Sequence, residues 1–361
     1  MKSAAMYAIK AKGAQDKYME TSNMHLFDAS KMLLGDEKYQ IVYGEIPCEC
    51  TYKIVTNTTG DNYDKAYQAT QSYERIIFKI QRECDLMNML DFVIPNPEKL
   101  SLNKMIKKIT CEFGGQIMDN ICTEDIETHI KTNCALFKRQ LNHINGKTFV
   151  PLTLAPLHSN NLCLPSSVHH ECKISIDVYS DIDVTKCKLY GNMYFLNTMQ
   201  SSNLKEKNFE YVTVQNQYCG VEKMQQGRNV FKVNFNHPVY LMYFWGFDKT
   251  KVTNIKFTFM IHSLYDGPIE TLEHLKLYDG PIEPLEHLKL SKGYDVEPVV
   301  MFFSHDMVGT STKSSINFSR IDEARLIIET EQEGTFPFYM VGLNMQPFAH
   351  RNGLVGLVYS K

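Results

Sequence analysis

The feature that most constrains this chain is the alternation of apolar and polar residues over several short segments. Residues 76–81, 174–179, 231–235 and 255–261 alternate with a period of two, which places successive side chains on opposite faces of a strand. Residues 240–247 are apolar on both faces, so we expect a strand that is covered on both sides. The alternating apolar residues are Ile76, Phe78 and Ile80; Ile174, Ile176 and Val178; Phe231, Val233 and Phe235; and Ile255, Phe257, Phe259 and Ile261.

Helical periodicity is rare by comparison. The best case runs from Glu124 to Asn142, where apolar residues recur at steps of three and four. Thr123 is placed to cap this helix, and Asn145-Gly146 lies just beyond its end. Many short strands with one or two short helices in loops predict an all-β sandwich or barrel rather than alternating β-α units.

The chain has 361 residues, which is enough for two domains of ordinary size. Residues 197–208 form a polar, weakly periodic stretch of the kind that joins domains. We therefore expect an N-terminal domain at residues 1–197 and a C-terminal domain at residues 198–361. Each length suits an eight-stranded antiparallel jelly roll, so the predicted fold is two jelly rolls in tandem.

The C-terminal half contains a tandem duplication. Residues 264–276 are repeated at once as residues 277–289, and the copies differ only at Thr271 and Pro284. Each copy contains Asp-Gly-Pro, which is typical of turns, and proline is disfavoured in a central strand. We expect a duplicated surface loop, residues 264–289, between two strands. A ligand role for its two Glu-His pairs is the less favoured alternative.

Composition argues against several classes of protein. No apolar run approaches the ~18 residues of a membrane-spanning helix, and lysines interrupt residues 1–17, so they do not form a secretory signal. The net charge is −3 without a long basic block, which argues against direct binding of nucleic acid. The ten cysteines are irregularly spaced and lack a CxxC pair, so we expect free buried thiols rather than zinc ligands or disulfides.

We find no motif for catalysis, and we predict that the chain is not an enzyme and binds no cofactor or metal. His169-His170-Glu171 is the densest cluster of potential ligands, but neighbouring residues of a strand point to opposite faces. Asn145-Gly-Lys-Thr148 lacks the earlier glycine of a phosphate-binding loop, because position 141 is Leu141. Asn57-Thr-Thr59 and Asn317-Phe-Ser319 match the glycosylation pattern, which we interpret as chance matches.

Two polar sites in the C-terminal half are predicted to be structural. His237 precedes an apolar strand that begins with Pro238, so we expect the histidine to fix the strand entry by hydrogen bonding rather than to bind a metal. Arg320 and Asp322 are expected to pair with each other or to tie down neighbouring loops. The residues expected to point into a core near these sites are Phe318, Ile321 and Trp245.

Five separated stretches of the chain, from residue 13 to residue 360, carry a family resemblance. They are Gly13-Ala-Gln-Asp-Lys-Tyr-Met19; Ile77-Phe-Lys-Ile-Gln-Arg82 with Asp85, Leu86 and Pro95; Phe149-Val-Pro-Leu152 with Leu164-Pro165 and His170-Glu-Cys-Lys-Ile174; Val233-Asn-Phe-Asn-His-Pro-Val239 with Trp245; and Ile316-Asn-Phe-Ser-Arg-Ile-Asp322 with Ala324-Arg-Leu326 and Asn352-Gly-Leu-Val-Gly-Leu-Val-Tyr-Ser360. Together, and in this order, they resemble the major capsid proteins of nucleocytoplasmic large DNA viruses.

The resemblance implies a double jelly roll that forms pseudo-hexagonal homotrimeric capsomers of an icosahedral shell. It further implies a virion protein, assembled in the host cytoplasm, whose partners are neighbouring capsomers and minor capsid proteins, and it allows proximity to an internal viral membrane. The loops are shorter than is usual in that family, so a minor capsid-like or scaffold paralogue of the same fold remains an alternative. A two-jelly-roll glycan-binding protein or hydrolase is the alternative from another class, since a fold does not fix function.

Overall fold

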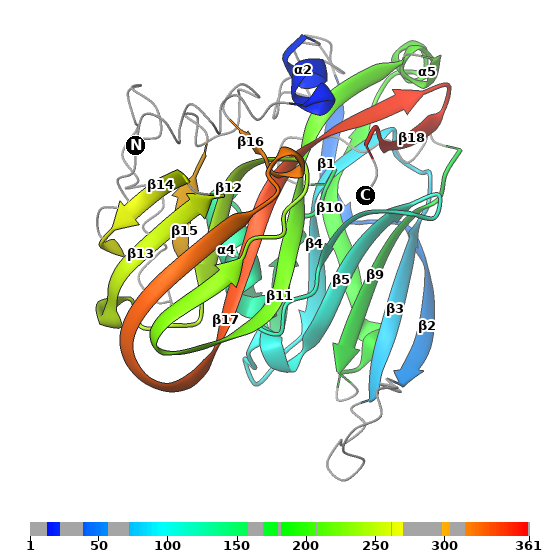
Figure 1. Cartoon of the computed structure of the whole chain (residues 1–361). Coiled ribbons are helices and arrows are strands. Elements are labelled where there is room, and N and C mark those ends of the chain that lie inside the picture. Colours follow the sequence, from blue (N-terminus) through cyan, green and yellow to red (C-terminus); the bar gives the residue numbers. More distant parts are fainter. Residues whose placement is uncertain are drawn as a thin grey trace. The chain divides into compact units, whose positions relative to one another are not determined.

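The computed structural model describes most of the chain, and its contacts group into two compact units (Figure 1). The first unit holds the described parts of residues 30–207 and 351–356, and the second unit holds those of residues 1–29, 208–350 and 357–361. The described residues are 13–21, 39–56, 72–157, 169–179, 182–206, 208–260, 262–269, 298–303 and 315–359.

The first unit consists of two five-stranded antiparallel sheets, in the orders β1-β10-β4-β8-β7 and β2-β3-β9-β5-β6. Strands β2 and β7 each form a hairpin with the next strand. The other eight are connected as a jelly roll, because the first lies beside the eighth in one sheet and the second beside the seventh in the other. The strands are β1 (Gln40–Glu45), β2 (Cys48–Thr56), β3 (Ser72–Ile80), β4 (Leu86–Pro95), β5 (Ile106–Phe113), β6 (Gln116–Ile121), β7 (Asn142–Ile144), β8 (Lys147–Pro151), β9 (Cys172–Tyr179) and β10 (Lys188–Phe195).

The second unit has the same connection, but two long strands take part in both of its layers. The start of β11 pairs with the end of β17, which also pairs with β12, while the end of β11 pairs with the start of β17, which also pairs with β13. Counting each half of β11 and β17 separately, together with β12, β13, β14 and β15, gives the eight strands of a second jelly roll. These strands are β11 (Phe209–Lys232), β12 (Pro238–Trp245), β13 (Val252–Phe259), β14 (His262–Gly267), β15 (Val299–Phe302) and β17 (Ala324–Arg351). Two short strands are additional: β16 (Ile316–Asn317) pairs with β12, and β18 (Leu354–Leu357) lies mostly within residues 351–356 of the first unit.

Both long strands pass from one layer to the other at a glycine. Gly227 in β11 has a φ of +95°, and the pairing register of β11 with β17 shifts between Gln225 and Gly227, where the partner changes from Thr335 to Thr330. Gly334 in β17 has a φ of +91°. Residues with a β-carbon rarely adopt this backbone conformation, so glycine at both positions allows each strand to bend.

The predicted alternation is confirmed, because every named apolar residue of the four segments that the structure describes is buried; Ile261 lies outside the described residues. All eight residues of β12 are buried, as expected for a strand covered on both faces. Alternate residues of β12, among them Met242 and Phe244, join the interior cluster of the second unit. The remaining alternate residues, Tyr243 and Trp245 among them, are buried on the opposite face.

The predicted helix is confirmed, but its ends were wrong. Helix α4 (Ile126–Leu136) begins after Asp125, whose side chain accepts a hydrogen bond from the Thr128 N–H, so Asp125 caps the helix instead of Thr123. The predicted range ended at Asn142, which is the first residue of β7. Asn145 and Gly146, with φ values of +51° and +70°, connect β7 to β8, as is typical of an Asn-Gly hairpin turn.

A second helix, α5 (Thr198–Glu206), lies where a linker was predicted. The Asn197 N–H donates to the Gln200 side chain at 3.0 Å, and the Gln200 N–H donates back to the Asn197 side chain at 2.8 Å. This reciprocal cap is the signal that the sequence interpretation missed. The predicted boundary between residues 197 and 198 falls at the start of α5 and stays a prediction.

A third helix, α2 (Ala14–Thr21), belongs to the second unit although it precedes the first unit in sequence. No helix in the described part of the chain is long and apolar enough to cross a membrane. The single-turn 3-10 helices are η1 (Leu102–Lys104), η2 (Val184–Lys186), η3 (Lys249–Lys251) and η6 (Phe318–Arg320).

The duplicated segment does not start in a loop. Its first four residues are the end of β14, where Leu264 and Tyr265 are buried and Tyr265 pairs with Phe257 of β13. The expectation of a loop from residue 264 was therefore wrong for these residues, because the leucine and tyrosine complete a hairpin. Residues 270–289, with both Glu-His pairs, lie outside the described residues.

Candidate functional site

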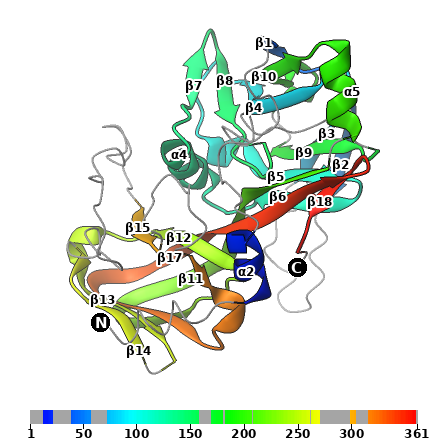
Figure 2. The ribbon, with the colours of Figure 1, turned by 90° about the horizontal axis from the view of Figure 1, so that it is seen from above.

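Helix α2 lies beside β17 in the second unit (Figure 2). A buried glutamine of the helix, Gln15, forms hydrogen bonds with this strand. The Nε2 atom of Gln15 donates to the Met345 carbonyl oxygen and to the Gln346 side chain, both at 3.1 Å. Its Oε1 atom lies 2.8 Å from Nδ1 of His237. Because the amide nitrogen faces a carbonyl, the amide oxygen must face the histidine, so Nδ1 of His237 carries a proton and donates.

An aspartate on the next residue makes the second attachment. The Oδ2 atom of Asp16 accepts from the Gly13 N–H at 2.7 Å and from Nδ2 of Asn317 at 2.5 Å. Met19 is fully buried, and the hydroxyl group of Tyr18 donates to Glu210 at the start of β11. Helix α2 therefore contacts the second unit through apolar packing and through hydrogen bonds from neighbouring residues.

His237 fixes the entry to β12, as expected from the sequence. It has a φ of +62°, its N–H donates to Oγ of Ser319 at 2.8 Å, and its carbonyl oxygen accepts from the Phe318 N–H at 3.1 Å. Pro238 follows as the first residue of β12. The prediction of a structural histidine is thus supported by contacts of its backbone and its ring.

We call Gln15, Asp16, His237 and Asn317 the N-terminal anchor. The four side chains come from three stretches of the chain, residues 13–19, 233–239 and 316–322, which the fold brings together. All four are buried, and each makes a hydrogen bond within the group. Asn317 is only 4% exposed, which makes it unsuitable as a glycosylation acceptor, as expected. Because all four side chains are buried, the N-terminal anchor is suited to holding helix α2 against the second unit and not to binding a ligand from solvent.

Arg320 and Asp322 do not form the expected pair. Both side chains are exposed, and among the residues that the structure describes neither makes an ion pair. A β-carbon added to Gly13 would lie 3.5 Å from Cδ of Arg320, so the aliphatic part of the arginine covers the chain before α2. Phe318 and Ile321 point into the core as predicted.

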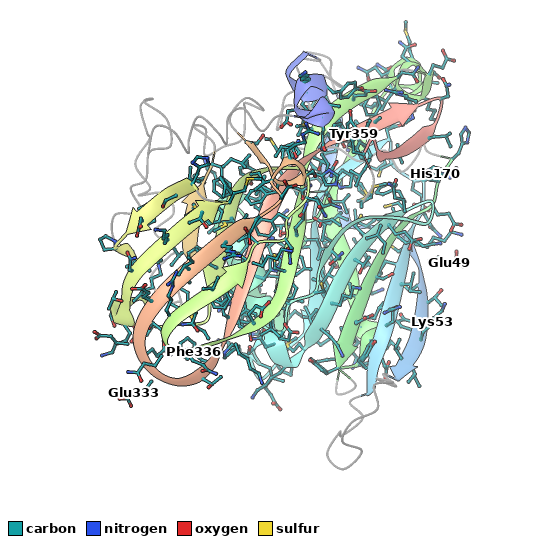
Figure 3. All side chains as sticks on the ribbon, in the orientation of Figure 1. Glu49, Lys53, His170, Glu333, Phe336 and Tyr359 are labelled. Atoms are coloured by element: carbon teal, nitrogen blue, oxygen red, sulfur yellow. The ribbon has the colours of Figure 1, made fainter. Side chains whose placement is uncertain are left out.

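The histidine cluster of the first unit makes hydrogen bonds to the segment before the C-terminus, and Figure 3 labels its member His170. The His169 N–H donates to the Gly353 carbonyl oxygen at 2.6 Å, and Nδ1 of His170 lies 3.1 Å from the Val355 carbonyl oxygen. Glu171 forms ion pairs with Lys79 at 2.5 Å and Lys173 at 3.0 Å, which hold the pKa of its exposed carboxyl well below its usual range. No group of three potential ligands suited to a metal ion occurs among the described side chains.

The first unit contains a buried charge pair that the sequence interpretation missed. The Nη2 atom of Arg139 lies 2.8 Å from Oδ1 of Asp91, and the Tyr43 hydroxyl donates to Oδ2 at 2.9 Å. Burial raises the pKa of the Asp91 carboxyl, while the guanidinium and the two hydrogen bonds oppose that shift. Three elements, β1, β4 and the segment after α4, are connected here. No sequence pattern links these positions, which pair only in the folded chain.

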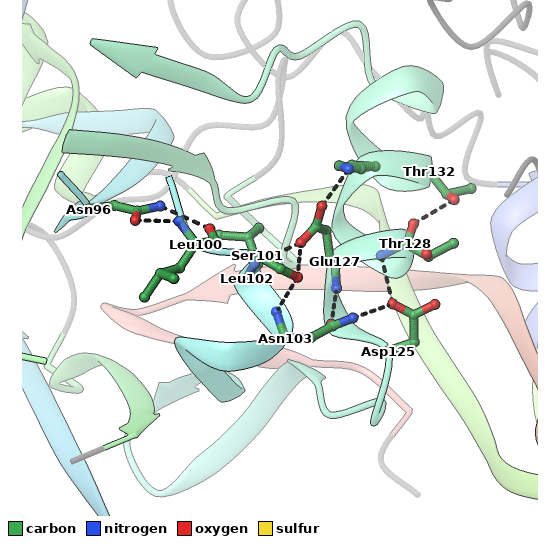
Figure 4. A network of polar contacts seen from close by, with 10 residues as sticks. Asn96, Leu100, Ser101, Leu102, Asn103, Asp125, Glu127, Thr128 and Thr132 are labelled. Carbon is green, nitrogen blue, oxygen red and sulfur yellow. Dashed lines mark hydrogen bonds and ion pairs between the residues drawn. The ribbon is translucent and has the colours of Figure 1, made fainter. Parts of the chain in front are cut away.

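A second polar network joins η1 to the start of α4 (Figure 4). Glu127 accepts from the Leu102 N–H at 2.7 Å, and its own N–H donates to the Asn103 side chain at 2.9 Å. Nδ2 of Asn103 donates to Asp125, the capping residue of α4, at 2.8 Å. Lys131, one turn along the helix, pairs with Glu127 at 2.5 Å. The network satisfies the N-terminal amides of α4 and has a structural role.

The nine described cysteines are all free, in agreement with the expected thiols, and Cys163 lies outside the described residues. Five of them are buried, and burial raises the pKa of several, Cys134 to about 12. A thiol with a raised pKa is a poor nucleophile, because the thiolate is the reactive form. Cys50 is exposed, so the expectation of burial was wrong for this residue.

Comparison with known proteins gives a match in structure and none in sequence. No family model matches the chain, and no curated protein matches it. A crystal structure of PBCV-1 VP54, fitted into a reconstruction of the virophage Sputnik, is similar with a TM-score of 0.63 and 12% identity, over 90% of this chain and 98% of that one. A quasi-atomic model of the PBCV-1 virus capsid gives a TM-score of 0.63 and 13% identity with the same coverage.

A third similar structure is the Faustovirus major capsid protein, with a TM-score of 0.53 and 8% identity over 87% of this chain and 92% of that chain. Identities this low speak for the fold alone. The chain has the double jelly-roll fold of these capsid proteins, which confirms the predicted fold class and, at the level of the fold, the resemblance of the five stretches.

Proposed function

We propose that this chain is a structural protein of a viral capsid, with no catalytic activity of its own. The observation that carries the proposal is the fold match over 90% of the chain to solved capsid proteins, which spans both jelly rolls. A protein with this architecture is suited to tiling a shell.

The proposed assembly unit is a homotrimer. Each chain contributes two jelly rolls of the same connection, so three chains present six similar bodies around one axis. Such a capsomer fills a hexagonal position of an icosahedral lattice. We propose neighbouring capsomers and minor capsid proteins as partners, the virion as the location, and the host cytoplasm as the place of assembly.

The described polar groups fit a structural role. The N-terminal anchor, the pair of Arg139 with Asp91, and the network around Glu127 are each engaged within the chain. The net charge of −3 supports a protein that does not bind nucleic acid directly. We therefore propose attachment and assembly, rather than turnover, as the task of these residues.

Mass measurement of the purified chain tests the proposal. Three chains of 41.7 kDa give a compact particle of about 125 kDa in size-exclusion chromatography with light scattering. A monomer over the whole accessible concentration range contradicts the trimer. Quantitative mass spectrometry of purified virions then separates shell protein from scaffold, since a shell protein is present at high copy number and a scaffold is absent from the mature particle.

A further inference from the structure

Strand β2 of the first unit has an open edge that is unusual for a protein that stays alone. It is nine residues long, pairs with β3 in an unbroken register, and contains neither a bulge nor a proline. Among the described strands, none pairs with its other side. Natural sheet edges are normally shortened, bent or covered, because free N–H and C=O groups pair readily with another strand.

The side chains of β2 are exposed on both faces. On one face Tyr52 is 42% and Ile54 77% exposed, although the corresponding face of β3 carries the buried Ile76 and Phe78. The core-facing side of the sheet therefore continues onto β2 as an apolar surface open to solvent. Strand β1, the edge of the other sheet, is also exposed, but its one charged residue, Glu45, pairs with Lys188 within the chain.

The opposite face of β2 carries Glu49, Thr51 and Lys53, all exposed (Figure 3). Lys53 lies directly opposite Arg75 of β3, so its neighbour within the sheet has the same charge. The carboxylate of Glu49 lies 3.9 Å from Lys79, which makes a shorter pair of 2.5 Å with Glu171. Each charge of β2 is thus only weakly compensated inside its own chain.

We propose that β2 pairs antiparallel with β2 of a second copy of this chain, about a twofold axis at Thr51. In that register Glu49 of each copy faces Lys53 of the other, and Cys50 of each copy faces Tyr52 of the other. By symmetry each of these two pairs forms twice, so the contact holds two ion pairs on one face and two apolar pairs on the other. Moving the axis to Cys50 or Tyr52 removes both ion pairs. Moving it to Glu49 or Lys53 places like charges opposite each other, which is unfavourable across a strand pair.

The proposed contact joins two five-stranded sheets into one continuous sheet across two copies. Backbone hydrogen bonds supply the attraction, and the charges select the register. The inference goes beyond the proposed function, because it needs no trimer. If the trimer also forms, the same contact links one trimer to the next.

Charge exchange tests the pairing. Glu49→Lys and Lys53→Glu each place two like-charge pairs in the contact, and each is expected to raise the Kd of association by about tenfold or more at low salt. An equimolar mixture of the two separately purified variants restores both pairs and is expected to associate as tightly as the parent. Glu222→Lys and Lys223→Glu, on the exposed bend of β11, make the same charge changes elsewhere and should have no effect.

A covalent trap tests the register. In an antiparallel pair, opposite Cα atoms are about 4.5–5.5 Å apart, which is within reach of a disulfide. Thr51→Cys is therefore expected to form a symmetric cross-link between copies under mild oxidation, and Lys53→Cys, which lies off the axis, is not. Equal cross-linking of both variants, or a variant mixture that fails to associate, overturns the inference. If the β2 variants still form particles with the mass of three chains, the capsid proposal stands even when the β2 pairing is disproved. The β2 pairing and the proposed function can therefore fail separately.

Discussion

The Nδ1 atom of His237 lies 2.8 Å from the Oε1 atom of Gln15, although the two residues are 222 positions apart in the chain. This contact attaches helix α2 to the entry of β12, and the remaining bonds of Gln15 reach the neighbouring strand β17. A side chain that satisfies three buried partners at once has no equivalent substitute. The second unit is therefore completed by a segment that precedes the whole of the first.

Removing this side chain should loosen the second unit. Gln15→Ala leaves the His237 ring nitrogen and the Met345 carbonyl without their bonds to Gln15, and we expect a loss of about 1–3 kcal/mol in the free energy of unfolding. Urea denaturation followed by circular dichroism measures the change. Gln225→Ala, at an exposed glutamine, is the matched control. Equal stability of both variants would show that the anchor contributes nothing.

The N-terminal anchor marks the limit of what the sequence could predict. The residue types of Gln15, Asp16, His237 and Asn317 stood out in separate stretches, and His237 was correctly predicted to be structural. Their meeting depends on chain separations of 222 and 301 residues, which local patterns do not encode. The strands were predictable for the opposite reason, because the period-two alternation of Ile174 and its neighbours records burial residue by residue.

The errors in the helices have local causes. The last turns of α4 were overestimated because apolar spacing continued past Leu136, whereas Asn145-Gly146 is a hairpin turn and pulls the preceding residues into β7. Helix α5 was missed because its polar composition hid the reciprocal cap of Asn197 with Gln200. In both cases a specific hydrogen-bonding residue outweighed the average character of the segment.

The pair of Arg139 with Asp91 should make stability depend on pH. Arg139→Met leaves a buried carboxylate without its partner, and we expect a loss of about 3–5 kcal/mol near pH 7. Burial raises the pKa of Asp91 in the folded protein above its ordinary value of 3.8. The protonation of Asp91 therefore favours the folded state at low pH, and this contribution to the free energy of unfolding is lost as the pH rises through the folded-state pKa. Removing Arg139 raises this pKa further, and the loss relative to the parent should shrink towards pH 4.

Urea denaturation of parent and variant at both pH values checks this prediction. Arg228→Met, at an exposed arginine on β11, controls for the removal of a positive charge. A penalty for Arg139→Met that stays the same from neutral to acidic pH would contradict an ionised partner at Asp91.

Trp245 should be required for a stable second unit. It is 2% exposed and stacks with Tyr243 and Tyr339 at ring distances of 5.8 and 5.1 Å. Trp245→Ala should cost about 3–5 kcal/mol, because it removes a large buried side chain and leaves a cavity. Met199→Ala, at a residue that is 76% exposed, serves as the control in thermal denaturation. An unchanged melting temperature for Trp245→Ala would show that the ring is not part of a core.

Two glycines separate backbone strain from steric overlap. At Gly115 the φ is +87° and an added β-carbon meets nothing, so Gly115→Ala should cost about 1–2 kcal/mol through its backbone conformation. At Gly246 the φ is +107° and the β-carbon would lie 2.1 Å from the Pro337 carbonyl oxygen. Gly246→Ala should therefore be clearly more destabilising in chemical denaturation. If both variants lose the same free energy of unfolding, β17 must move away from the new β-carbon at position 246 without an energetic cost.

Electron microscopy of the purified oligomer tests the central claim most directly. Two jelly rolls in each chain and three chains in each particle predict a threefold map in which six similar densities form a ring. A particle without threefold symmetry, or a threefold particle with a single jelly-roll density for each chain, would contradict the account.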